Sequence, residues 1–145
     1  MPLSVKPAQN CERMVFFMIA EIIGHFGENV INALGLNIAT GTEIILSEHT
    51  IKHIKDKHPE ITGDCKRIIA DIIAVPHGVS FRAKDSTIGF FKGCETGELF
   101  FLELSVRSSN IGEYFVRTLH FIETDRVEKR MKNGKIISLD KYLYP

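Results

Sequence analysis

Three of the six histidines in this 145-residue chain fall within ten residues of one another, between Leu46 and Glu60. His49 and His53 are four residues apart, so a helix would place them on the same face. His58 follows His53 by five residues and points elsewhere, in the last turn of the expected helix, where the helix dipole favours a protonated imidazole. Because imidazole exchanges protons near neutral pH with little tuning, one or more of these residues could act as a general acid or base.

Two other interpretations of this segment stay open. The His-x-x-x-His spacing of His49 and His53 can bind zinc, although the segment has no HExxH motif and Lys52 and Lys57 would repel a dication. In a purely structural interpretation, His58 caps the helix while His49 and His53 are solvated. The polar groups that surround the folded helix would distinguish the catalytic, metal-binding and structural interpretations.

A second group of polar residues follows Gly78, where the hydrophobic period changes from helical to two. Four segments alternate apolar and polar residues, as half-buried strands do. If helices cover one face of the sheet, the other face receives seven polar side chains: Arg82, Lys84, Ser105, Arg107, Tyr114, Thr118 and His120. Cations, hydroxyls and an imidazole on one surface are suited to binding a phosphate, although the outer face of any antiparallel sheet is polar.

Two further residues of these strands fit this surface less simply. Glu103 alternates onto the same face, but Phe101 beside it suggests packing there. Arg117 falls on the opposite side from Thr118, so both belong to one site only if a β-bulge interrupts the strand. The alternation of the strands therefore assigns no role to Glu103 or to Arg117.

Caps and prolines predict the helices that precede these strands. Ser47 is suited to cap a helix that Pro59 ends, and Thr62 to cap a second helix that Pro76 ends. Both helices carry apolar residues at helical spacing, which gives each of them one face to bury.

The strands and the remaining elements complete an α+β domain. Strands are expected over 79–84, 87–92, 99–107 and 114–122, and their short connections favour an antiparallel meander. A charged helix over 125–132 and an edge strand over 135–139 follow. The pattern predicts N-terminal helices packed on one face of a four-stranded antiparallel β-meander.

Composition limits the class of protein. A chain of 145 residues, 44% of them hydrophobic, suits one compact unit, with residues 1–41 as an apolar extension packed on a domain of residues 42–145. Eighteen Lys and Arg balance eighteen Asp and Glu, so any binding to nucleic acid must come from local charge. Three cysteines without a CxxC pair favour free thiols. The apolar run Val15–Ile23 is too short to span a bilayer and lacks the flanks of a signal peptide, so we expect a cytoplasmic protein, with this run as a possible homodimer contact.

A family resemblance rests on the histidine helix and the last strands. The segment ILSEHTIKHIKDKHPEI, a second helix, PHGVSF and two long strands ending YFVRTLHFIE resemble the phage-associated branch of the barnase–EndoU–colicin–RelE group of RNases. Members carry a helix with the pattern HI…(R/K)HP, here His53-Ile54 and Lys57-His58-Pro59. The resemblance covers residues 43–125 and implies one or two helices before a four-stranded antiparallel sheet, whereas the first 40 residues match nothing that we can name.

The resemblance implies cleavage of RNA without a metal or another cofactor, through attack of the substrate's 2′-hydroxyl on the adjacent phosphate. It makes His53 and His58 the first candidates for acid and base, and Arg82 a phosphate ligand through its guanidinium. Thr118 and His120 would donate to the phosphate or supply the second proton-transfer group. Strand alternation alone suggests substrate binding by Lys84, Ser105, Arg107 and Tyr114.

We therefore predict a small endoribonuclease, of the kind used as toxins or phage effectors, with RNA and an immunity protein or antitoxin as partners. One alternative is a non-catalytic binding or regulatory module on the same fold, and another is a metal hydrolase that uses His49 and His53. Catalysis requires His53 or His58 to lie on the order of 5–8 Å from the strand-borne groups that would hold the phosphate. A scaffold protein would scatter these groups over separate surfaces.

Overall fold

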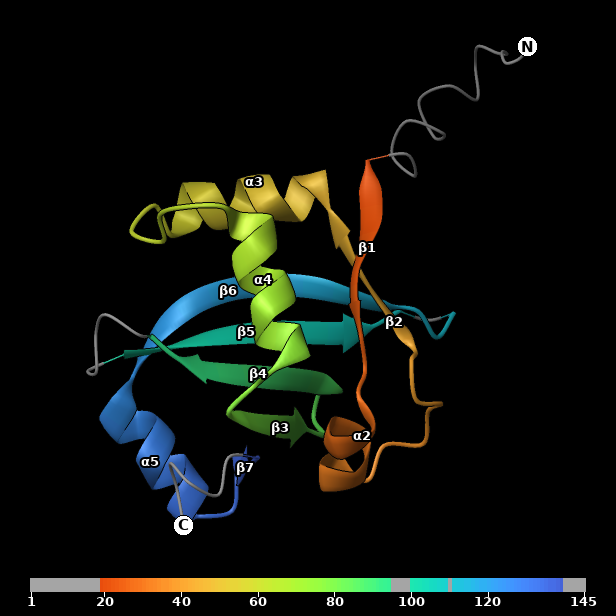
Figure 1. The fold of residues 1–145 in the computed structure, drawn as a ribbon, viewed down its shortest axis with the longest axis vertical. Coiled ribbons are helices and arrows are strands. Elements are labelled where there is room, and N and C mark those ends of the chain that lie inside the picture. The colour runs from red at the N-terminus through yellow and green to blue at the C-terminus, as the bar shows by residue number, and fades with distance from the viewer. Residues whose placement is uncertain (1–18, 95–99, 110, 140–145) are drawn as a thin grey trace.

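The computed structural model describes residues 19–94, 100–109 and 111–139, which form four helices and one seven-stranded sheet (Figure 1). In chain order the elements are β1 (Ala20–His25), α2 (Glu28–Leu34), β2 (Glu43–Ser47), α3 (Glu48–Lys57), α4 (Cys65–Ala74), β3 (Gly78–Arg82), β4 (Thr87–Gly93), β5 (Phe100–Ser108), β6 (Tyr114–Glu123), α5 (Thr124–Lys132) and β7 (Ile137–Ser138). The first part of the apolar run Val15–Ile23 lies outside the described residues, and the rest enters β1. None of the helices in the described ranges is long and apolar enough to cross a membrane.

The strand order of the sheet is β1-β2-β6-β5-β4-β3-β7. Strands β3 to β6 form the predicted antiparallel meander. The expectation of four strands is wrong, because the β1–β2 hairpin extends one edge and β7 extends the other. β2 runs parallel to β6, which makes the sheet mixed. Pairing between segments this far apart in the chain leaves no local pattern in the sequence.

Helix α3 lies beside the part of the outer edge of β6 with which β2 does not pair. β2 pairs with β6 only through Ile44 with Tyr114 and Ile45 with Phe115, and α3 begins directly after β2. The Thr50 hydroxyl then donates to a backbone carbonyl of β6 at 3.4 Å, and α3 lies beside this strand (Figure 1). The histidines of α3 are thereby brought next to β6.

The ends of α3 follow the sequence signals, whereas the start of α4 does not. Ser47 accepts a hydrogen bond from the Thr50 amide at 3.1 Å, and the helix ends before Pro59, as predicted. The cap of α4 is Asp64, which accepts from the Arg67 amide at 3.3 Å. Thr62 is not the cap because Gly63, with a φ of +96°, separates it from the helix.

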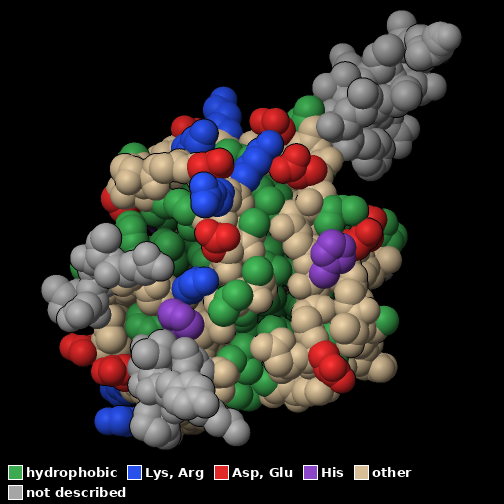
Figure 2. All heavy atoms as spheres, viewed as in Figure 1, with side chains coloured by type: hydrophobic (Ala, Val, Ile, Leu, Met, Phe, Trp, Pro, Cys, Tyr) green, Lys and Arg blue, Asp and Glu red, His purple; other side chains and the backbone are tan. Residues whose placement is uncertain are grey.

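Helices cover both faces of the sheet, and not one face as the sequence predicts. Helices α2, α3 and α4 pack over the larger core, whose fully buried members include Ile54, Ile69, Phe90 and Leu104. Acidic and basic side chains are interspersed over the α3 and α4 side (Figure 2), so that side presents no large patch of one charge.

Helix α5 lies on the other face of the sheet, over a second and smaller core. Val127 is fully buried there, in a cluster with Phe91, Phe101 and Ile122. The helix occupies the residues predicted for it, and Gly134, with a φ of +76°, turns the chain after its end. The predicted edge strand is confirmed as β7, which pairs with β3. α5 covers only one end of this face and leaves the rest open.

Candidate active site

The face of the sheet that α5 partly covers carries three rows of residues, each of which runs across neighbouring strands. The strand register aligns the first row as Arg82, Thr87 and Arg107, the second as Ser80, Gly89, Ser105 and Thr118, and the third as Phe91, Glu103 and His120. Successive rows are two residues apart along the strands, which is about 7 Å. Guanidinium groups, hydroxyls and a carboxylate–imidazole pair therefore follow one another across the face.

A β-bulge in β6 decides which residues of that strand reach this face. Ser105 pairs with Thr118, but the next residue, Val106, pairs with Val116, which leaves Arg117 as the extra residue. The alternation reverses at this point. Arg117 and Thr118 consequently line the same cavity, so the bulge satisfies the condition under which both could belong to one site.

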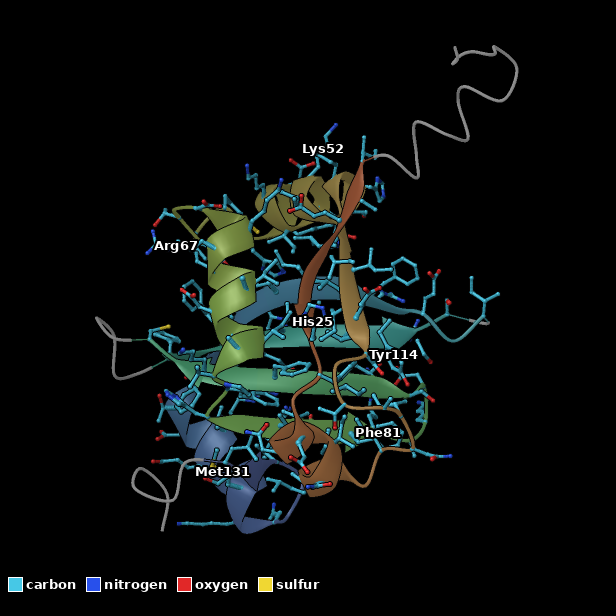
Figure 3. All side chains as sticks on the ribbon, turned by 45° about the vertical axis from the view of Figure 1, so that its right-hand side comes forward. His25, Lys52, Arg67, Phe81, Tyr114 and Met131 are labelled. Carbon is cyan, nitrogen blue, oxygen red and sulfur yellow. The ribbon has the colours of Figure 1, made fainter. Side chains whose placement is uncertain are left out.

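Tyr114 precedes the bulge and faces the opposite side from the one expected. Its ring meets that of Phe26 edge to face, with 5.0 Å between centroids, and packs against the larger core. Figure 3 shows it at the end of β6 where β2 pairs. Counting alternation back from His120 misplaces Tyr114 because the bulge adds one residue. The face predicted for Tyr114 is therefore wrong: its ring packs against the larger core and lines neither of the cavities described below.

Arg82 and Arg107 share the carboxylate of Asp85, which comes from the turn between β3 and β4. Arg82 donates to it through Nε at 3.0 Å and Nη2 at 2.8 Å, and Arg107 donates through Nη2 at 3.2 Å. The hydrogen bonds from Arg82, and then that from the Thr87 side chain, lower the pKa of Asp85 well below its ordinary value. Two guanidiniums around one anionic group form the same kind of bonds that arginines make with phosphate.

His120 is oriented by Glu103 in the third row. Its Nε2 lies 3.2 Å from Oε1 of Glu103. The Glu103 carboxylate thus engages Nε2 and leaves Nδ1 as the ring nitrogen outside this contact. The Glu103 side chain is 18% exposed and that of His120 34%. The pair is thus shielded on one side and accessible on the other.

Glu103 is a site residue to which the sequence pattern gave no role. The available signal was its alternation with Ser105 and Arg107, which puts all three on one face of β5. Phe101, which suggested packing at Glu103, is indeed buried, but it is covered by α5. The next residue on that face, Glu103, already lines the open cavity.

His58 lies beside His120, with 5.8 Å between ring centroids. It is the residue at which α3 ends, and its backbone amide donates to the Ile54 carbonyl at 2.8 Å. Its Nδ1 is 3.3 Å from the Glu60 carboxylate. Two imidazole–carboxylate pairs therefore adjoin where the end of α3 meets β6.

Two adjoining cavities lie over the three rows. The larger, of about 770 Å³, is lined by Glu103 and His120 and by side chains of α5. The smaller, of about 240 Å³, is lined by His53 of α3 and by Arg107 and Arg117. Both include Arg82, Thr87, Ser105 and Thr118. His53 therefore faces, from the α3 side, residues that also line the cavity of His120.

Most of the residues predicted for the site are thus brought together. Those that line the cavities are His53, Arg82, Ser105, Arg107, Thr118 and His120. His58 adjoins His120 but lines neither cavity. Lys84 lies in the turn after β3, which ends at Arg82, and its exposed side chain also lines neither.

A metal centre would need at least three ligands close together. Within the described ranges, no three His, Cys, Asp or Glu side chains are grouped so that they could hold a metal ion. A zinc site on His49 and His53 would therefore need a third ligand from outside these ranges.

The sequence of the chain matches a known protein family. Residues 21–129 match the family model described as phage-Barnase-EndoU-ColicinE5/D-RelE like nuclease3. The chain belongs to this family. The resemblance inferred from the histidine helix is confirmed, and the protein is a member of a phage-associated nuclease family. The match begins in β1 and ends in α5, so it includes all the elements that line the cavities except the last residues of α5, Arg130 among them, and the segment after α5. No curated protein and no solved structure matches the chain.

Proposed function

We propose that the protein is a metal-independent endoribonuclease that uses the substrate's own 2′-hydroxyl as the nucleophile. One arrangement supports this: His120, held by Glu103, and His53 approach a shared floor of hydroxyls and guanidiniums from two sides. Transesterification of RNA needs a base, an acid and cationic or hydroxyl donors to the phosphate. These are the groups that line the two cavities.

In the proposed reaction, the scissile phosphate binds over the second row. The hydroxyls of Ser105 and Thr118 donate to its oxygens, and the guanidinium of Arg82 balances its charge. Nδ1 of His120 removes the proton of the 2′-hydroxyl, and the 2′-oxygen forms a bond to phosphorus. The bond from phosphorus to the 5′-oxygen breaks, and protonated His53 donates a proton to that oxygen. The products are a 2′,3′-cyclic phosphate and a free 5′-hydroxyl.

Two considerations favour His53 over His58 as the acid. His53 lines a cavity together with Arg82 and Thr118, whereas His58 lines neither cavity. His58 instead adjoins His120 with Glu60 at its Nδ1. We assign His58 a positioning role beside the base.

The proposal is tested by cleavage of a fluorescently labelled RNA oligonucleotide in EDTA. We expect cleavage to persist in the chelator and to stop when the reacting nucleotide carries a 2′-deoxyribose. His120→Asn and His53→Asn should each reduce kcat by about 10²- to 10⁴-fold, the usual contribution of general acid–base catalysis. His49→Asn is the matched control, because His49 lies one turn earlier on α3, is exposed and lines neither cavity.

Each contrary result supports a different alternative. Activity that the chelator abolishes would indicate a metal hydrolase, particularly if His49→Asn were also inactive. RNA binding without cleavage by the wild-type protein would indicate a binding module on the same fold. Cleavage of the 2′-deoxy substrate would exclude the 2′-hydroxyl as nucleophile.

A further inference from the structure

Helix α5 contributes two arginines to the larger cavity. Arg126 and Arg130 are one helical turn apart, so their side chains lie on one side of the helix, and both line the cavity that contains Glu103 and His120. Val127, which follows Arg126 directly, is fully buried against the sheet and anchors the helix. The orientation of α5 is thus set by its apolar stripe, and the arginine pair borders that stripe on the cavity side.

The described residues supply no counter-charge to this arginine pair. Within the described part of the chain, neither the Arg126 nor the Arg130 side chain has a hydrogen-bond or ion-pair partner, in contrast to Arg82 and Arg107, which share Asp85. Among the described residues that line the larger cavity, Glu103 is the only acidic one, and it is engaged by His120. An anionic ligand would therefore supply the missing counter-charge at this end of the cavity.

This arginine pair lies well away from the first row. The cluster around Val127 includes Phe91 of the third row and Phe101 one row beyond it, which places the base of α5 about 14–20 Å from the first row at 3.4 Å per residue. Even long arginine side chains from these two ends of the face would contact different oxygen atoms of a bound ligand. One phosphate group is too small to engage both, whereas successive phosphates of one nucleic-acid strand could.

We propose that Arg126 and Arg130 form a second phosphate subsite, which binds a phosphodiester next to the scissile one in single-stranded RNA. The proposal rests on the endoribonuclease function and specifies its substrate as an oligonucleotide that occupies more than one nucleotide position. A basic groove that follows the backbone is the usual device for binding single strands without regard to sequence. The subsite lies on the far side of His120 from Arg82 and Arg107.

The test compares a dinucleotide, which has one phosphodiester, with a pentanucleotide that is cleaved between the same two nucleotides. Arg126→Gln/Arg130→Gln should leave kcat/KM for the dinucleotide within twofold of wild type and lower it at least tenfold for the pentanucleotide, mainly through KM. The slope of log affinity against log salt for the pentanucleotide should become shallower by about 0.7 for each phosphate that the variant no longer neutralises. Glutamine keeps part of the side-chain stem, and thermal unfolding would verify that the variant is folded.

Lys129→Gln/Lys132→Gln is the matched control. It removes the same charge from the same helix, but these exposed lysines do not line the cavity, so pentanucleotide kinetics should remain at the wild-type level. An equal effect of both double variants, or an equal loss on both substrates, would overturn the subsite.

The affinity for a non-cleavable RNA tests the phosphate subsite independently of the proposed cleavage reaction. The affinity of a non-cleavable 2′-O-methyl pentanucleotide is measured by fluorescence anisotropy for the wild type and both double variants. A tenfold loss that is confined to the arginine variant supports the subsite even if the wild type cleaves nothing, in which case only the proposed reaction fails. Unchanged affinity in the arginine variant overturns the subsite whether or not RNA is cleaved.

Discussion

Gly89 lies at the centre of the proposed phosphate floor, and replacing it by alanine should reduce activity far more than stability. It sits between Ser80 and Ser105 in the second row and lines the larger cavity. A glycine inside a strand often marks a place where a ligand approaches the backbone closely. A methyl group here would rise from the floor toward the substrate.

The expected cost to stability follows from the neighbours of that methyl group. A Cβ on Gly89 would lie 2.5 Å from Oγ of Ser80 and 3.0 Å from Cε1 of Phe91. The serine hydroxyl can rotate away, and crowding of this kind costs about 1–3 kcal/mol. Alanine recovers about 0.5–1 kcal/mol of the entropy that glycine loses in a strand. We therefore expect a net loss of about 0–2.5 kcal/mol.

The expected effect on catalysis is larger. Displacement of a reacting group by about 1 Å can cost on the order of 10²-fold in rate, so kcat/KM on the RNA oligonucleotide should fall about 100-fold. Urea unfolding measures the stability of the same preparations. In a Ser80→Ala background the contact with Oγ is absent, so Gly89→Ala should cost less stability there while the loss of activity persists.

Gly93→Ala is the control for this prediction. Gly93 is on the same strand and face as Gly89, but the nearest atom to its added Cβ, Nδ1 of His77, is 3.5 Å away, and it does not line the cavity. Its activity should stay near the wild-type level. The assignment of the phosphate floor is refuted if Gly89→Ala retains activity within about threefold of Gly93→Ala while remaining folded.

Three further predictions concern stability. The hydrogen bonds from Arg82 lower the pKa of Asp85, so its stabilising contribution is complete above about pH 4 and is lost as the pH falls further; urea unfolding of Asp85→Asn between about pH 5 and pH 2 should therefore show a weaker pH dependence than the wild type. Leu104 is fully buried between the sheet and its helices, so Leu104→Ala should cost about 2–5 kcal/mol in the same measurement, and a loss below about 1 kcal/mol would contradict the packing. Ser47→Ala removes the cap of α3 and should cost about 0.5–2 kcal/mol, whereas an unchanged midpoint would show that the cap is dispensable.

The elements that follow local rules could be predicted from the sequence. Ser47 and Pro59 bound α3 because capping and the missing proline amide act within one turn of helix. The alternation in β3, β4 and β5 correctly placed Arg82, Ser105 and Arg107 on one face, because each strand is regular over those residues. The histidine helix likewise revealed the nuclease family.

The incorrect predictions concern features that depend on contacts between distant segments of the chain. The pairing of β2 with β6 and the position of α5 over Phe101 bury apolar surface that each segment exposes when considered alone, so no window of neighbouring residues indicates them. The adjacent polar residues Arg117 and Thr118 were the only local sign of the bulge in β6, and the bulge turned Tyr114 toward the larger core.

Residue types and short spacings thus specified the helices, the meander and the polar side chains available for chemistry. The convergence of His53 with His120, and the contact of His120 with Glu103, arose from the packing of α3 on the unpaired edge of β6 and from the register of β5 against β6. The physical reason is that caps and periodicity are interactions between chain neighbours. Strand pairing and burial instead minimise the exposed apolar surface of the whole chain, and they set distances between residues that the sequence keeps far apart.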